Sequence, residues 1–124
     1  MNELMADVLV AEDNPLNFEL VRDLLDSRGH TVVWARDGQE ALAKASSGQF
    51  DLLLLDLHMP RMDGLQVVRA LREAPPERPL KVIALTADAM AGVRDDLIAA
   101  GVDGYLSKPL DLRALIQEME SIGV

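Results

Sequence analysis

Side chains able to carry phosphoryl chemistry occur at four places in this sequence, each beside the end of a short apolar run. Glu12 and Asp13 follow the first run, Asp56 follows four consecutive leucines, Thr86 ends a later run and Lys108 follows the last. Two carboxylates about 5 Å apart repel by roughly 3 kcal/mol at an effective dielectric of 20. An acidic cluster therefore requires a bound cation or protonated carboxyl groups, and oxygen ligands without His or Cys favour Mg²⁺. An Asp beside Mg²⁺, Lys and Thr is equipped to become an aspartyl phosphate.

The apolar runs are typical of strands, and the segments between them are typical of helices. Leu52–Leu55 lacks polar alternation, which predicts a strand buried on both faces. The predicted strands are Ala6–Ala11, Thr31–Ala35, Asp51–Leu55, Leu80–Leu85 and Asp103–Leu106. The predicted helices begin at Asn14-Pro15, at Asp37 with Glu40 in a pattern resembling a capping box, after the turn 60–64, at Asp88 and at Asp111.

Five alternations of strand and helix predict an α/β protein. The expected fold is a doubly wound (βα)5 three-layer sandwich with a five-stranded parallel sheet in the order 2-1-3-4-5, the flavodoxin-like arrangement. Because parallel strands end at one edge, Asp13 and Asp56 are expected side by side there, with Thr86 and Lys108 nearby. Each residue alone has an ordinary role as a turn or cap residue. Complementary charges at four neighbouring strand ends favour a functional site instead.

The composition predicts one soluble domain. The chain has 124 residues, 49% hydrophobic and 27% charged, which fits a single domain over residues 1–124 with its core at about 6–120 and no output domain. A net charge of -9 argues against direct contact with nucleic acid. There is no cysteine, no signal peptide, and no apolar run near the roughly 20 residues of a membrane span. We expect a cytoplasmic protein that binds neither nucleic acid nor membranes.

The sequence resembles the receiver domain of two-component response regulators over nearly its whole length, from about Asp7 to Glu120. The resemblance is carried by the acidic pair Glu12-Asp13, the segment DLHMPRMDG at 56–64, Thr86-Ala87 and Lys108-Pro109. Their order and spacing are specific to that family. The stretches LVAEDNPLN, ALTADAM and AAGVDGYLSKPL look most like receivers of hybrid histidine kinases or close stand-alone relatives.

The resemblance implies a phosphoacceptor and a metal site. Asp56 would take a phosphoryl group from a phosphohistidine of a histidine kinase or histidine phosphotransfer protein. Mg²⁺, with Mn²⁺ able to substitute, would be held by the side chains of Asp13 and Asp56. The backbone carbonyl of His58 would also bind the ion, and Glu12 would bind it through water. Lys108 would hold a phosphoryl oxygen, and its peptide bond to the following proline is expected to be cis.

The resemblance also implies a conformational switch. Thr86 would move toward the phosphoryl group and Tyr105 would turn inward. That change would reshape the surface formed by the helix predicted from Asp88, the strand at 103–106 and the helix from Asp111, which a downstream protein would read. His58 and Asp88 would tune the phosphoryl lifetime. On this account the chain is a signalling protein that catalyses only its own phosphotransfer and slow autodephosphorylation.

Other functions fit the residues less well. A phosphohydrolase of the haloacid dehalogenase type needs a second Asp two residues after its nucleophile, where this chain has His58. A flavin or nucleotide binder needs glycines in the first turn to cradle phosphate, and the turn here is acidic. A degenerate receiver kept as a scaffold would have lost reactive positions, whereas all of them are filled here.

Overall fold

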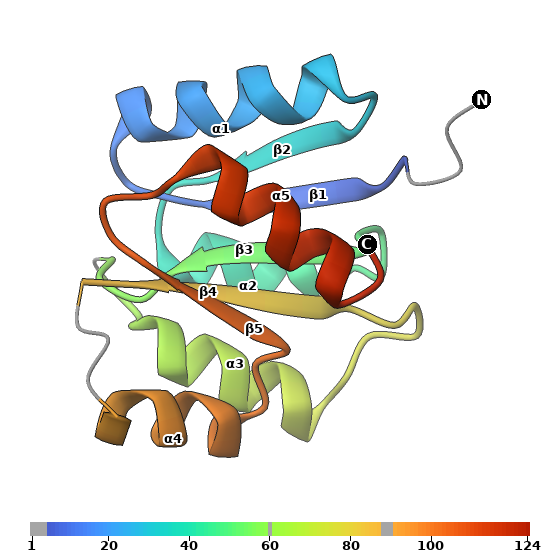
Figure 1. Ribbon diagram of the computed structural model, residues 1–124. Coiled ribbons are helices and arrows are strands. Elements are labelled where there is room, and N and C mark those ends of the chain that lie inside the picture. The colour runs from blue at the N-terminus through green and yellow to red at the C-terminus, as the bar shows by residue number, and fades with distance from the viewer. Residues whose placement is uncertain (1–4, 60, 88–90) are drawn as a thin grey trace.

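In this computed structural model, which describes residues 5–59, 61–87 and 91–124, strands and helices alternate along the chain (Figure 1). The strands are β1 Asp7–Ala11, β2 Thr31–Ala35, β3 Leu52–Asp56, β4 Lys81–Thr86 and β5 Gly104–Ser107. The helices are α1 Pro15–Ser27, α2 Gly38–Ala45, α3 Gly64–Glu73, α4 Ala91–Ala100 and α5 Leu112–Ser121. None of the helices in the described part of the chain has the length and apolar character needed to cross a bilayer.

The five strands form one parallel sheet in the order β2-β1-β3-β4-β5, as the sequence predicts. Helices α1 and α5 cover one face of this sheet, and α2, α3 and α4 cover the other, which gives three layers (Figure 1). The central strand β3 is fully buried, with Leu52 to Leu55 all at 0% exposure. Its side chains alternate between the two hydrophobic cores, so Leu53 and Leu55 pack under α2 and α3 while Leu52 and Leu54 pack under α1 and α5.

The helix ends follow the local sequence with one correction. The side chain of Asn14 accepts hydrogen bonds from the amides of Leu16 and Asn17, which caps α1 as expected. At α2 the Asp37 carboxylate accepts from the amide of Glu40, but the Glu40 carboxylate accepts from the amide of Arg36 instead of completing a capping box. The reciprocal box occurs at α3, between Asp63 and Gln66. Asp88, the predicted cap of the fourth helix, lies outside the described residues.

Three strands, β3, β4 and β5, end one residue later, toward the site, than the sequence predicts. The third strand begins at Leu52, and the carboxylate of the preceding Asp51 accepts hydrogen bonds from Asp7 N and from the guanidinium of Arg78. Asp56 and Thr86 are the last residues of β3 and β4, and both are almost completely buried. The turn after β3 is tight as well, since a Cβ added to Gly64 would lie 2.5 Å from Cδ2 of Leu57.

The proline-rich connection between α3 and β4 is anchored at the edge of the sheet opposite these two residues. Arg78 forms ion pairs with Asp7 at 3.1 Å and with Asp51 at 2.7 Å, and it also donates to the carbonyl of Gln49 at 2.9 Å. The guanidinium therefore joins the start of β1 to the residue before β3. Polar side chains therefore hold the edge of the sheet at which the strands begin. The candidate site lies at the opposite edge, where the strands end.

Candidate functional site

Asp56 lies at the centre of the edge where the strands end, on the left of Figure 1. Its side chain is 1% exposed. Oδ1 accepts a hydrogen bond of 2.9 Å from the amide of His58, and Oδ2 accepts one of 2.6 Å from Nζ of Lys108. Both carboxylate oxygens are thus engaged, one by the turn after β3 and one by the connection that follows β5. These contacts fix the orientation of the most deeply buried carboxylate that the described residues place at this edge.

The acidic pair is held by the neighbouring strand β2. Glu12 donates its amide hydrogen to the carbonyl of Ala35 at 3.0 Å, and its own carbonyl accepts from Nε1 of Trp34 at 2.7 Å. The Glu12 carboxylate accepts from the amide of Asn14 at 3.1 Å. Glu12 is buried, with 5% exposure, while Asp13 is exposed at the mouth of the site. The two carboxylates therefore approach Asp56 from different depths.

Three carboxylates converge here in a manner that fits a divalent cation. Oxygens of Glu12, Asp13 and Asp56 all lie within 4.8 Å of one another. The three donors are hard oxygen ligands, and the exposed position of Asp13 leaves the cluster open to solvent, as an ion that keeps several waters requires. The residues present therefore suit a hard divalent ion such as Mg²⁺.

Burial of Glu12, together with the neighbouring charge of Asp56, disfavours the ionised form of its carboxyl group. The pKa of Glu12 is raised from 4.5 to about 7, chiefly because burial removes the carboxylate from water and also because the charge of Asp56 repels it. The amide of Asn14 and the charge of Lys108 lower the same pKa but do not offset those effects. One added positive charge between the carboxylates would favour the ionised form of Glu12.

Thr86 and Lys108 reach the site from the other side of β3. Thr86 is 2% exposed at the end of β4, and its carbonyl accepts from the amide of Lys108 at 2.8 Å. The peptide bond between Lys108 and Pro109 is cis, as the resemblance implies. Tyr105 is half-buried on β5, and the guanidinium of Arg94 on α4 lies 5.7 Å from the centre of its ring. The topology brings together every predicted site residue that the structure describes except Tyr105. That residue lies on the edge strand β5, three residues before Lys108.

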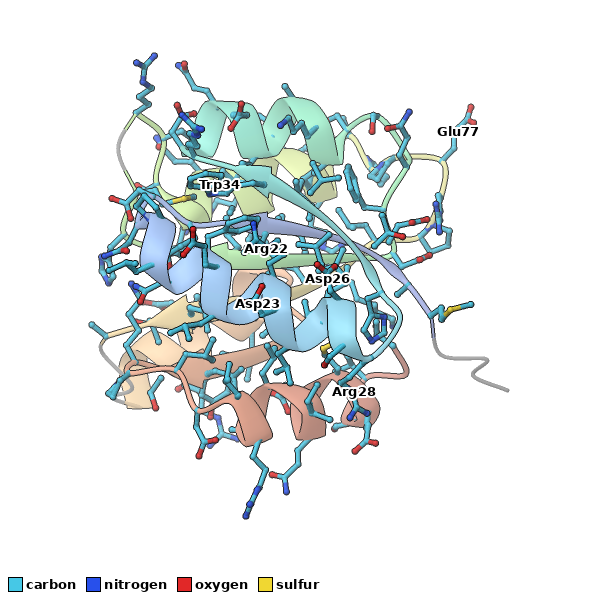
Figure 2. All side chains as sticks on the ribbon, turned by 90° about the horizontal axis from the view of Figure 1, so that it is seen from above. Arg22, Asp23, Asp26, Arg28, Trp34 and Glu77 are labelled. Carbon is cyan, nitrogen blue, oxygen red and sulfur yellow. The ribbon has the colours of Figure 1, made fainter. Side chains whose placement is uncertain are left out.

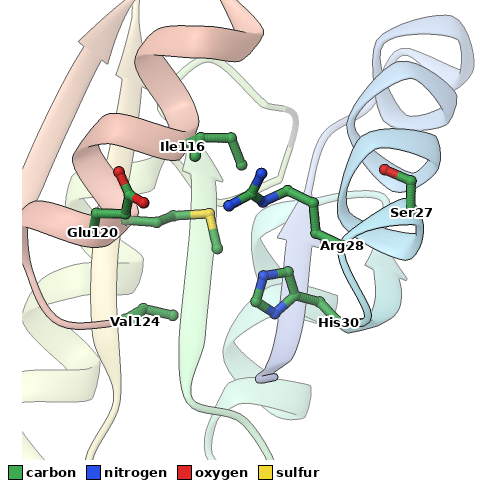
Figure 3. Close-up of a pocket in the computed structure, with 7 residues that line it drawn as sticks. Ser27, Arg28, His30, Ile116, Glu120 and Val124 are labelled. Carbon is green, nitrogen blue, oxygen red and sulfur yellow. The ribbon is translucent and has the colours of Figure 1, made fainter. Parts of the chain in front are cut away.

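Two cavities lie at opposite ends of the molecule. A groove of about 630 Å³ opens beside the site between α1 and the connection from β5 to α5, and Glu12, Leu20, Lys108, Pro109 and Leu112 are among its lining residues. The second cavity, of about 420 Å³, lies at the far ends of α1 and α5, where Arg28 and His30 face Ile116 and Glu120 (Figure 3). His30 is buried there, and its Nδ1 accepts from the amide of Ala6 at 2.9 Å. Only the first cavity touches the acidic cluster.

Sequence reasoning missed the contact between Trp34 and Glu12. The spacing of 22 residues carries no local signal, because the indole reaches the acidic pair across the β1–β2 boundary. The strand register offers one partial hint. Ala35 pairs with Ala11, the last residue of β1, and Trp34 comes directly before Ala35. Once the strand order is known, Trp34 could be placed next to the pair, but the direction of its ring could not.

Comparison with known proteins identifies the family. The model of the response regulator receiver domain matches residues 8–120. The polar-differentiation response regulator DivK of Brucella anthropi is 37% identical over 114 residues, which cover 92% of this chain and 93% of DivK. The chain belongs to the response regulator receiver domain family, and it is therefore a signalling domain of two-component and phosphorelay systems rather than a member of an enzyme family.

Further relatives are parts of larger proteins. The sensor histidine kinase GacS of Pseudomonas protegens is 42% identical over 113 residues, which cover 89% of this chain. The chain spans 12% of the length of GacS and 12% of the histidine kinase BarA of Shigella flexneri.

Solved structures of similar fold include two that contain relevant ligands or partners. One is the receiver domain of sensor histidine kinase PA1611 from Pseudomonas aeruginosa, which has a magnesium ion coordinated in its active-site cleft. It has a TM-score of 0.83 at 33% identity, and the match covers 97% of this chain and 99% of the PA1611 receiver domain. The receiver domain of the Saccharomyces cerevisiae response regulator Ssk1, crystallised with the phosphotransfer protein Ypd1, has a TM-score of 0.89 at 25% identity, covering 99% and 92%.

Proposed function

We propose that Asp56 accepts a phosphoryl group from the phosphohistidine of a histidine kinase or a histidine phosphotransfer protein. The observation that carries this proposal is the buried Asp56 carboxylate held between Lys108 and an acidic pair. In the transfer, an oxygen of Asp56 forms a bond to phosphorus while the bond from phosphorus to the imidazole nitrogen breaks, and the histidine takes the electron pair. The domain supplies the acceptor and the charges around it, and the partner supplies the activated phosphoryl group.

The residues around Asp56 are suited to hold the transferred group. Lys108 occupies Oδ2 of Asp56 at 2.6 Å in the resting protein, so this cation is already placed to exchange the carboxylate oxygen for a phosphoryl oxygen. The buried hydroxyl of Thr86, at the end of the adjacent strand, would donate to another phosphoryl oxygen. Lys108 and Thr86 together would stabilise the negative charge on the phosphoryl group during its transfer, which is the main requirement of this reaction.

The acidic cluster would hold Mg²⁺, or Mn²⁺ in its place. Asp13 and Asp56 would bind it through their carboxylates, His58 through its backbone carbonyl and Glu12 through water. When bound, the metal would offset the charges of the carboxylates and of the incoming phosphoryl oxygens. The convergence of three carboxylates within 4.8 Å supports this assignment.

Phosphorylation would then change a surface distant from Asp56. Thr86 would follow the phosphoryl group, Tyr105 would turn inward from its half-buried position, and the surface of α4, β5 and α5 would change for a downstream protein. His58 and Asp88 would set how fast water removes the phosphoryl group in a slow autodephosphorylation, although Asp88 lies outside the described residues. A cytoplasmic location is part of this proposal and rests on the family.

The test is the intact mass of the protein after incubation with a small phosphodonor such as acetyl phosphate, with Mg²⁺ or with EDTA. We expect the mass of one phosphoryl group on the parent with Mg²⁺, and none with EDTA or on Asp56→Asn. Asp23→Asn is the matched control, since Asp23 is exposed on α1 away from the site and this variant should be modified like the parent (Figure 2). An adduct that persists on Asp56→Asn would refute the assignment of the acceptor.

A further inference from the structure

Trp34, the single tryptophan of the chain, contacts the backbone of the acidic pair just beyond the point where the pairing of β1 with β3 ends. The pairing between β1 and β3 ends at Ala11 and Leu55. Beyond that point the amide of Glu12 still donates to Ala35, but the carbonyl of Glu12 accepts from the indole Nε1 of Trp34 at 2.7 Å. A side chain of β2 thus holds the peptide group between Glu12 and Asp13.

The indole itself is held in place on several sides. Its ring stacks on Phe18 of α1, with centroids 4.5 Å apart and an angle of 7° between the planes. The guanidinium of Arg36 lies 4.5 Å from the centre of the indole ring, and Nζ of Lys44 binds the carbonyl of Trp34 at 2.8 Å. Figure 2 shows Trp34 on β2, beside the helix that carries Phe18. A ring restrained in this way can fix the direction of the peptide to which it donates.

The acidic pair needs such a restraint because its charges oppose the arrangement. Carboxylates of Glu12 and Asp13 lie within 4.8 Å of Asp56, and their mutual repulsion favours a turn that opens toward solvent. A Glu12 carbonyl without the indole would bind water, which does not oppose rotation of the peptide. The contact from Trp34 therefore favours the orientation of the Glu12 peptide in which the three carboxylates converge.

We propose that Trp34 is a positioning residue that sets the affinity of the acidic cluster for a divalent cation. This inference rests on the proposed function, since it takes the cluster to be a Mg²⁺ site. Trp34 does not touch the cation or the phosphoryl group, and it acts through the peptide of Glu12 alone. Loss of one hydrogen bond that orders the ligands should weaken Mg²⁺ binding about fivefold to tenfold.

The experiment is a calorimetric titration of Mg²⁺ into the parent and into Trp34→Phe. The variant keeps an aromatic ring able to stack on Phe18 and removes the N–H donor together with the second ring of the indole. We expect its Kd for Mg²⁺ to rise about fivefold to tenfold, while the rate of modification by acetyl phosphate at saturating Mg²⁺ stays within twofold of the parent. Leu24→Ala is the control, because it removes a half-buried side chain from α1 and lowers the Tm without touching Glu12.

The outcomes separate this inference from the proposed function. A Kd in Trp34→Phe equal to that of the parent overturns the positioning role and leaves the metal site intact. A parent that binds no Mg²⁺ overturns both. An equal loss of affinity in Leu24→Ala would show that the effect follows stability, which also overturns the inference.

A second measurement needs no variant. Trp34 is the only tryptophan, so the emission of the parent reports the surroundings of this one indole. We expect Mg²⁺ to change the emission with the Kd found by calorimetry. An emission that stays constant while heat is released would mean that Trp34 is not coupled to the cluster.

Discussion

Replacing Glu12 by glutamine should stabilise the protein at high pH and have much less effect at low pH. The glutamine oxygen can still accept from the amide of Asn14, so the change removes the charge and keeps the hydrogen bond. Burial and the charge of Asp56 raise the pKa of Glu12 from 4.5 to about 7. The folded protein therefore favours the protonated carboxyl, and the unfolded chain does not.

The sign and size of the effect follow from this shift. A raised folded pKa contributes stability that is complete below the unfolded value of 4.5 and is lost as the pH rises through about 7. Between pH 5 and pH 8 the parent should lose roughly 2 kcal/mol that Glu12→Gln does not lose, since each pKa unit is worth about 1.4 kcal/mol. Titrating groups remote from Glu12 act alike in both proteins and cancel from the comparison. For a chain of this size the Tm difference should grow by roughly 5–10 °C.

The assay is thermal unfolding of both proteins in EDTA at pH 5 and pH 8, repeated at pH 8 with excess Mg²⁺. We expect the advantage of Glu12→Gln to appear at pH 8 in EDTA and to shrink with Mg²⁺, because a bound cation stabilises the ionised parent. Glu77→Gln in the proline-rich connection, exposed to solvent (Figure 2), is the matched control and should show no such dependence on pH. Equal stabilisation by Glu12→Gln at both pH values would refute the electrostatic account of this pocket.

Leu54→Ala, which removes a fully buried side chain from β3, should lower the free energy of unfolding by about 2–5 kcal/mol in urea denaturation; a loss below about 1 kcal/mol would contradict the two-sided burial of the strand. His30→Asn retains an acceptor for the amide of Ala6 but removes the titrating ring. Because burial and Arg28 lower the pKa of His30 below 6.5, the parent should lose stability as the pH falls from 7.5 to 5.5. The variant should lose less, and parallel Tm profiles would count against this role. Lys108→Gln removes the cation from Oδ2 of Asp56. It should slow modification by acetyl phosphate about a hundredfold while Mg²⁺ binds at least as tightly; an unchanged rate, measured by intact mass over time, would exclude the role of Lys108.

The sequence predicts the fold and the clustering of the site because both depend on simple patterns. Uninterrupted apolar runs locate the strands, and the strand order then brings Asp56 next to the acidic pair. The catalytic and switching roles of these residues stay predictions. Details that depend on contacts between distant elements escape local patterns: Asp51 accepts from Arg78, and Trp34 donates to Glu12. In both cases tertiary packing selects the partner, which no spacing along the chain records. The Glu40 contact is local, but the choice between the amides of Asp37 and Arg36 depends on the conformation of the turn before α2.

The alternating leucines of β3 have a mechanical consequence. Each of them is locked into one of two cores, so the strand cannot slide or tilt without opening voids on both sides of the sheet at once. Asp56 therefore lies at the end of a strand that is packed tightly on both faces. The edge strand β5 differs, since its Tyr105 and Leu106 are only half-buried. A rearrangement that starts at Asp56 would therefore meet close packing on both faces of β3 and looser packing at β5.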